Sequence, residues 1–158
     1  MADRIVVDTG PLIALARADA LGVIGALPIE FVAPQAVRAE LDEGVRRGHA
    51  AVSAPWLQFM QAATPMIDAV ARAELGAGEA AVIQLALEQG IAVVAIDERK
   101  GRRAALSVGL RVTGSLGLLG RAKVLGIVPT VGPYVERLRA GGWFAADLLE
   151  RFVAAFDE

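Results

Sequence analysis

The stretch IAVVAID at residues 91–97 decides the fold, because a continuous apolar run leads straight into an acid, Asp97. A second apolar run, residues 5–7, leads in the same way into Asp8. Uninterrupted runs of this length are typical of strands that are buried on both faces of a parallel sheet. Weaker strand candidates lie at residues 30–33, 56–60 and 110–113.

Helical patterns separate these strands. Residues 11–18 and 34–47 each begin with a proline, which suits the first turn of a helix, and we expect Gly10 to cap the first of them. Further helices are predicted at residues 77–89, 98–108, 115–125 and, divided at Gly141-Gly142, 134–156. The alternation of strand and helix predicts the α/β class with a mostly parallel central sheet.

Length and composition narrow the choice of protein class. A chain of 158 residues fits one domain, residues 1–158, and we expect residues 130–158 to form a C-terminal helical appendage. There is no cysteine, so a metal would be held by oxygen atoms or by the single histidine, His49. The net charge of −2 gives no bulk attraction for nucleic acid. With no secretory signal and no apolar run near the roughly 20 residues of a membrane span, we expect a cytoplasmic protein.

Two acids follow the two strongest strand candidates. Asp8 and Asp97 would emerge at the same edge of a parallel sheet, where α/β proteins bind their ligands. The alternative for each is structural, since an aspartate after a strand also forms a turn or caps the next helix.

Two further acids lie on predicted helices. Glu79 lies on the same predicted helix face as apolar residues within 82–86, whereas Gln84 and Glu88 belong to the opposite, polar face. A carboxylate on a core-facing stripe is costly unless something compensates it. Its structural alternative is a first-turn glutamate that complements the helix dipole. Glu40 lies at the edge of an apolar stripe, where it is either functional or a boundary residue with a solvated head.

The four acids together carry more information than any one of them. Four ionised carboxylates in one cleft would repel each other and raise some of their pKa values. A divalent cation would relieve that repulsion, and an all-oxygen ligand set favours Mg²⁺ or Mn²⁺ over zinc.

Four segments occur in the order IVVDTGPLIALAR, APQAVRAEL, LGAGEAAVIQLALEQG and VVAIDERKGRRAALSVGLRVTGSLGLLGRAK, and they cover most of residues 4–128. Together with the tail VPTVGPYVERLRAGGWFAADLLERFV, they resemble the PIN-domain family. The resemblance is to its predicted nucleic-acid-binding branch, which is related to VapC-type toxins. It implies a three-layer α/β/α fold with a mostly parallel sheet.

The resemblance also assigns residues to a site. Thr9 and Ser115 match hydroxyl positions near the family's acids, Gly10 stands where serine is frequent, and Glu98 stands where an aspartate usually follows. The implied catalytic acids are Asp8, Glu40, Glu79 and Asp97, and the implied metal ligands are Asp8, Glu79, Asp97 and Glu98.

The activity implied by the resemblance is a Mg²⁺- or Mn²⁺-dependent endoribonuclease. A metal-activated water would attack the RNA phosphodiester in line and leave a 5′ phosphate. Family relatives include toxins, so the resemblance further implies a small antitoxin partner and a homodimer.

A basic segment directly follows Asp97. Its cations would contact RNA phosphates beside the acids, or else form an ordinary solvated helix face. No aromatic residue interleaves them to stack bases, so no sequence readout is apparent. The candidate RNA-binding residues are Arg99, Lys100, Arg102 and Arg103.

An apolar stripe lies near the C-terminus, within residues 148–156. We expect it to pack on the protein's own sheet, and the alternative is a dimer face or an antitoxin groove.

Two other functions compete with a nuclease. One is a PIN-like module that binds nucleic acid or protein without cutting it. The other is a phosphotransfer protein, either a dehalogenase-like phosphatase or a receiver domain. The phosphatase needs a second aspartate at the position of Gly10, and a receiver needs a strand-end lysine, whereas Lys123 lies in a predicted helix.

Overall fold

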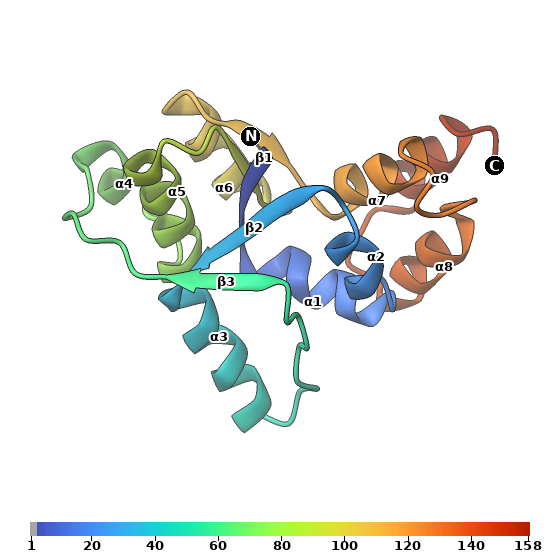
Figure 1. Cartoon of the computed structure of the whole chain (residues 1–158), viewed down its shortest axis with the longest axis horizontal. Coiled ribbons are helices and arrows are strands. Elements are labelled where there is room, and N and C mark those ends of the chain that lie inside the picture. The colour runs from blue at the N-terminus through green and yellow to red at the C-terminus, as the bar shows by residue number, and fades with distance from the viewer. Residues whose placement is uncertain (1–2) are drawn as a thin grey trace.

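The protein is described here by a computed structural model covering residues 3–158. Its centre is a five-stranded sheet in which every strand is parallel to its neighbours, in the order β3-β2-β1-β4-β5 (Figure 1). The strands are β1 (Asp3–Val7), β2 (Ile29–Pro34), β3 (Leu57–Met60), β4 (Val93–Ala95) and β5 (Arg111–Thr113). All five predicted strands are therefore present, and the predicted class is confirmed.

The two most apolar runs take neighbouring interior positions in the sheet. β1 lies in the middle, with Ile5 to Val7 at most 2 % exposed, and β4 lies beside it. The β1–β4 ladder extends past the end of β1, because the amide of Asp8 donates to the carbonyl of Ala95 at 3.0 Å. This bond fixes the backbone of Asp8 at the carboxyl edge of the sheet.

Helices cover the sheet, which gives the predicted three layers. α5 packs on β1, β2 and β4, α3 packs on β2 and β3, and α6 and α7 pack on β5. The helices are α1 (Thr9–Arg17), α2 (Leu21–Gly25), α3 (Gln35–Arg46), α4 (Asp68–Arg72), α5 (Ala77–Gln89), α6 (Arg99–Ser107), α7 (Ser115–Val124), α8 (Gly132–Gly141) and α9 (Ala146–Ala154).

Two expectations about helices are wrong, and two short helices were not expected. The first helix starts at Thr9, so Asp8 rather than Gly10 occupies the N-cap position. The short helices α2 and α4 were not predicted. The supposedly polar face of α5 is covered: Gln84 is 4 % exposed, accepts from the amide of Ile67 at 3.0 Å and donates to the carbonyl of Pro65 at 3.1 Å. The segment between β3 and α5 satisfies these polar groups, which allows α5 to be buried on nearly all sides.

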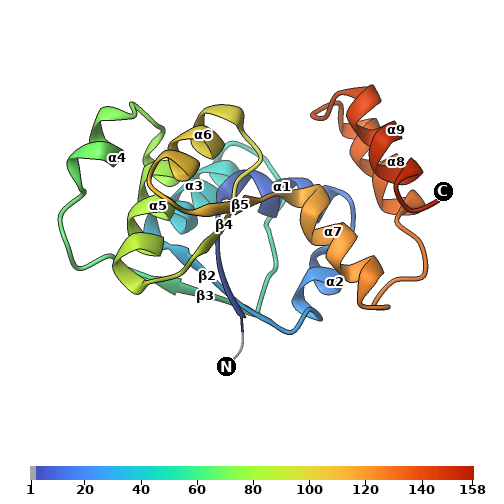
Figure 2. The same cartoon turned by 90° about the horizontal axis from the view of Figure 1, so that it is seen from above.

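Helices α8 and α9 lie at one end of the molecule, beyond α7 and away from β3 (Figures 1 and 2). The C-terminal apolar stripe packs on α7 and α8 rather than on the sheet. Leu149 is fully buried, and Phe152 and Phe156 approach Gly120 of α7. Leu148 stays 39 % exposed.

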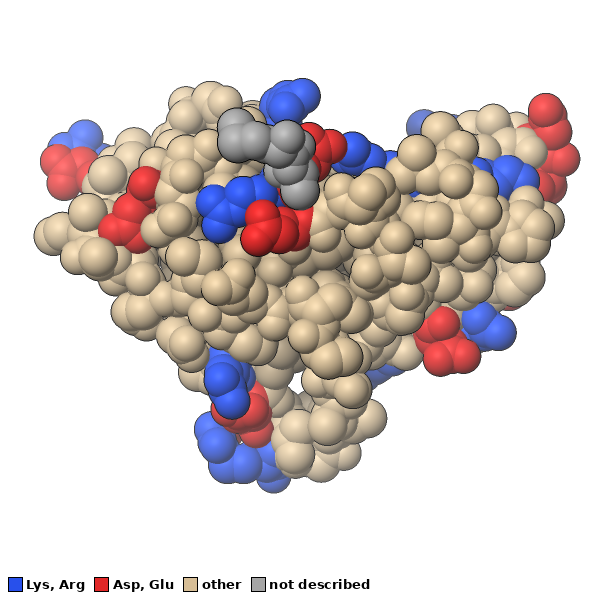
Figure 3. All heavy atoms as spheres, viewed as in Figure 1, with Lys and Arg blue, Asp and Glu red and all other residues tan. Residues whose placement is uncertain are grey.

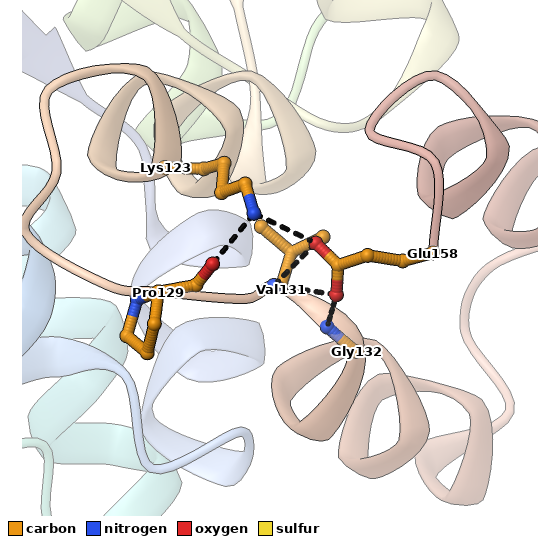
Figure 4. A network of polar contacts seen from close by, with 5 residues as sticks. All are labelled: Lys123, Pro129, Val131, Gly132 and Glu158. Carbon is orange, nitrogen blue, oxygen red and sulfur yellow. Dashed lines mark hydrogen bonds and ion pairs between the residues drawn. The ribbon is translucent and has the colours of Figure 1, made fainter.

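The end of the chain is held by one carboxylate. Glu158 accepts from the amides of Val131 and Gly132 at 2.9–3.1 Å and pairs with Lys123 at 3.4 Å (Figure 4). These contacts tie Glu158, four residues beyond the end of α9, to the end of α7 and the start of α8. Within residues 3–158, no helix has both the length and the apolar character to cross a bilayer.

Candidate active site

Asp8 and Asp97 lie at the carboxyl ends of the neighbouring strands β1 and β4, as predicted from the sequence. Val7 pairs with Ala95 in the register of these strands, so both aspartates emerge at the same edge of the sheet. The amide of Ile96 donates to the carbonyl of Thr113 at 3.0 Å, which anchors the backbone just before Asp97.

Asp8 is a buried carboxylate with little local compensation. It is 6 % exposed, and although it occupies the N-cap position of α1, its side chain makes no capping hydrogen bond. Burial raises the pKa of Asp8 from 3.8 to about 6, the nearby Thr9 amide opposes the rise, and the charges of Glu40, Asp97 and Glu98 add to it. Capping of α1 therefore does not explain this aspartate.

Asp97 is held by the start of α7. The amide of Ser115 donates to its Oδ1 at 2.8 Å, and the fully buried Ser115 hydroxyl donates to its Oδ2 at 2.6 Å. Burial raises the pKa of Asp97, while the bonds from Ser115 and the charge of Arg102 oppose that rise. The predicted hydroxyl partner is thus in direct contact with an acid of the site.

Glu79 and Glu98 lie next to each other beside Asp8. Burial raises the pKa of Glu79 to about 7, hydrogen bonding with Glu98 adds to the rise, and the charge of Asp8 adds further. The same hydrogen bond lowers the pKa of the exposed Glu98. The Oε2 atom of Glu79 is buried and has no hydrogen-bond partner among the described residues.

Glu40 is the most open of the four predicted catalytic acids. It lies on α3, is exposed, and accepts a hydrogen bond from the Thr9 hydroxyl at 3.0 Å. Its charge is close enough to raise the pKa of Asp8. The Thr9 contact therefore joins the first turn of α1 to α3 across the site.

Three glycines lie against three of the acids, a feature that sequence reasoning missed. A Cβ atom at any of them would overlap the neighbouring carboxylate, the pairs being Gly78 with Glu40, Gly101 with Glu79 and Gly114 with Asp97. Because the carboxylates occupy the space of the missing side chains, the acids can come close to one another.

A family model described as a PIN domain matches residues 4–158. The chain belongs to the PIN-domain family. No curated protein and no solved structure gives a match to the chain. PIN domains are generally nucleases, which is consistent with acids gathered at the carboxyl edge of the sheet.

The basic segment of this PIN domain serves the structure in part. Arg102 donates from Nη1 to the carbonyls of Ile96 and Thr113 at 2.8 and 3.2 Å, and Lys100 donates to the carbonyl of Glu74 at 2.9 Å. Arg99 and Arg103 are exposed. On the face seen in Figure 3, charged side chains lie in small groups of both signs, with wide uncharged areas between them.

Three hollows are lined in part by Glu40, Asp97 or Glu98. The first, the α1–α3 groove, has a volume of about 410 Å³ and is lined by Arg17, Glu40, His49 and Trp143 among others. The second, the acid-side hollow, has about 420 Å³ and lies between α1 and residues 143–148, with Asp97 and Glu98 in its wall. The third, about 460 Å³, lies on the other side of Phe144 and Leu148 and also reaches Asp97.

The donor chemistry of the site fits a hard divalent cation. Every acid offers only oxygen, the site holds uncompensated negative charge, and the buried Glu79 Oε2 lacks a partner among the described residues. Within residues 3–158, however, no three acidic or histidine side chains are already arranged to hold one ion. The acids therefore lie near one edge of the sheet without forming a preorganised metal site among the described residues.

Proposed function

We propose that this PIN domain is a metal-dependent endoribonuclease, with Asp8, Glu40, Glu79 and Asp97 as its catalytic acids. The observation that supports this most strongly is poorly compensated negative charge at one sheet edge, where the pKa of Asp8 is about 6 and that of Glu79 about 7. Carboxylates with raised pKa values in a cleft are typical of functional sites.

Asp8, Glu79, Asp97 and Glu98 would hold Mg²⁺ or Mn²⁺. Such an ion, when bound, neutralises charge on a phosphodiester and lowers the pKa of a water that serves as nucleophile. Ser115 keeps both oxygens of Asp97 in fixed positions, and Thr9 orients Glu40. Asp8 and Glu79 must lose their protons before they act as ligands or proton acceptors.

The test is cleavage of labelled RNA with added Mg²⁺ or Mn²⁺, or with a chelator. Wild type is compared with Asp8→Asn and Asp97→Asn, and Asp42→Asn on α3 is the matched control because Asp42 is exposed. We expect metal-dependent cleavage, with 5′-phosphate ends, by wild type and the control only. Equal activity of all four proteins would refute the assignment of the site.

A second candidate function is a PIN module that binds RNA or protein without cutting it. It is favoured by one observation, namely that no three ligand side chains are preassembled within residues 3–158. RNA binding without cleavage by wild type, at every metal concentration tried, would support this second function and contradict the first.

We extend the nuclease proposal to the toxin of a toxin–antitoxin pair, with a small antitoxin as partner and a homodimer as the working form. The support is the resemblance of residues 4–128 to VapC-type relatives. Induced expression should stop growth with wild type but not with Asp97→Asn, and the product of the neighbouring reading frame should restore growth. Unimpaired growth with active wild-type protein would contradict the toxin role.

A further inference from the structure

Trp143 is a large aromatic side chain that is partly exposed to solvent near the acids. It is 47 % exposed and lies between α8 and α9, directly after Gly142. Gly142 has a φ of 73°, a left-handed conformation that glycine adopts readily, and this conformation ends α8 and sends the chain across the start of α1. The position of Trp143 is thus set by the backbone as well as by its own packing.

The indole borders two of the three hollows. It lines the α1–α3 groove, which contains Glu40, and it lines the acid-side hollow, which contains Asp97 and Glu98. Phe144 and Leu148 continue the apolar wall of the acid-side hollow. Trp143 is the residue that these two hollows share, with Glu40 in one and Asp97 and Glu98 in the other.

A cation holds one side of the ring. The Arg17 guanidinium lies 4.0 Å from the centroid of the ring, which is cation–π geometry. Arg17 lines the α1–α3 groove with Trp143, but it does not line the acid-side hollow. Arg17 therefore contacts one face of the ring and belongs to the groove, whereas it is not among the residues that line the acid-side hollow.

We propose that Trp143 stacks on a base of single-stranded RNA whose backbone passes the acid-side hollow. The proposal rests on the proposed nuclease function and deepens it by naming a side chain that would hold a base of the RNA beside the acids. Bases of single-stranded RNA are splayed and stack on aromatic side chains, whereas paired bases are not available for this. With a net charge of −2, the protein gains little affinity from phosphates alone, so base stacking supplies what a basic patch would provide elsewhere.

The experiment measures binding in the Asp8→Asn background, which prevents cleavage. The probe is a short fluorescein-labelled oligoribonucleotide of mixed sequence, compared with the same backbone carrying abasic sites. Binding is followed by anisotropy for the Asp8→Asn parent and for the same protein carrying Trp143→Phe, Trp143→Leu or Val124→Ala. Val124→Ala is the control, because Val124 is 75 % exposed and lies at the far end of α7. Thermal melts of all four proteins check that each is folded.

We expect Trp143→Leu to bind roughly five- to one-hundred-fold more weakly, Trp143→Phe to keep most of the affinity, and Val124→Ala to match the parent. The abasic probe should bind weakly, and its affinity should be the same for the parent protein and for Trp143→Leu. In a Trp56→Phe background, where Trp143 is the only tryptophan, the base-containing probe should quench indole emission.

Unchanged affinity of Trp143→Leu, or absence of quenching, would overturn the proposal. It also fails if Trp143→Leu lowers the sedimentation coefficient of the free protein, because the ring would then belong to an interface between copies. Cleavage by the unmodified protein, assayed in parallel, separates the two claims. Cleavage that does not depend on Trp143 refutes only the stacking role, whereas Trp143-dependent binding without cleavage refutes only the nuclease.

Discussion

Glu158 and Asp8 are both carboxylates held against the start of a helix, yet their environments have opposite effects. Glu158 receives amide hydrogen bonds from Val131 and Gly132 at the start of α8 and a charge from Lys123, and these contacts lower its pKa. Asp8 stands at the start of α1 without a capping bond, and burial raises its pKa to about 6. The ionised Glu158 therefore stabilises the folded state, whereas the ionised Asp8 destabilises it.

The two carboxylates therefore impose opposite pH dependence on stability. The lowered pKa of Glu158 adds stability above its unfolded value of 4.5, and this stability is lost as the pH falls through the folded value. The raised pKa of Asp8 favours folding below 3.8, and that contribution is lost as the pH rises through about 6.

The largest effect is expected from Asp8→Asn. Because the pKa rises from 3.8 to about 6, the ionised side chain costs on the order of 2–3 kcal/mol of folding free energy at pH 7. We expect RNA cleavage to fall more than about 100-fold, since even residues that only support metal ligands cost 10–100-fold. The free energy of unfolding at pH 7, measured in urea, should rise. A variant that loses activity and stability together would contradict this picture.

The next effect comes from the partner of Asp97. Ser115→Ala removes the 2.6 Å hydrogen bond to Oδ2, and we expect cleavage to fall roughly 10–100-fold. The pKa of Asp97 should rise further, because a bond to its charged form is lost, so the rate should reach its plateau at higher pH. Ser107→Ala is the control, since that hydroxyl donates only to the carbonyl of Ala104 in the same helix. Equal pH profiles for both variants would exclude a role of Ser115 in the site.

A smaller effect is expected from a methyl group placed against Glu79. Gly101→Ala keeps every acid but overlaps the Glu79 carboxylate, and we expect roughly tenfold slower cleavage from the displaced side chain. Gly22→Ala on α2 is the matched control, because nothing lies within 4 Å of its added Cβ. That control should keep full activity and gain about 0.5–1 kcal/mol of helix stability. Comparable rates for the two variants would show that Glu79 tolerates the shift.

The smallest effect on activity should come from Glu158→Gln. Cleavage should be unchanged, while Tm at pH 7 falls by roughly a few degrees because charged acceptors of three hydrogen bonds become neutral. The loss should shrink at pH 4, where Glu158 contributes less. Glu136→Gln, which removes an exposed pair with Arg139, is the control and should leave Tm nearly unchanged. A fall in cleavage with Glu158→Gln would show that the C-terminal contacts reach the site.

The fold was predictable because its deciding signals are local. The apolar runs before Asp8 and Asp97 predict parallel strands, and the same runs place both aspartates at one edge of the sheet. Other features depend on contacts between distant segments. The Gln84 face was predicted only to be the polar face of its helix, because nothing near it in sequence reveals that residues 64–67 would cover it. Five-residue helices such as α2 and α4 carry too few turns for a clear period.

The acids of the site were partly predictable, and their surroundings were not. The contact between Ser115 and Asp97 was expected only from the family resemblance. Trp143 was missed because it lies 46 positions after Asp97 and comes close only through the packing of α8 and α9. The glycines against Glu79 and Asp97 have no sequence signal either, since a helical glycine resembles any other until its neighbour is known.

The three glycines that receive the acids have a consequence for how this lineage can change. A gene copy that acquires a side chain at Gly78, Gly101 or Gly114 would lose the geometry of one acid while retaining every acid in its sequence. The presence of all four acids in a sequence therefore does not show that the protein is active. PIN-domain chains that bind without cutting should be sought first among those in which one of these glycines has been replaced.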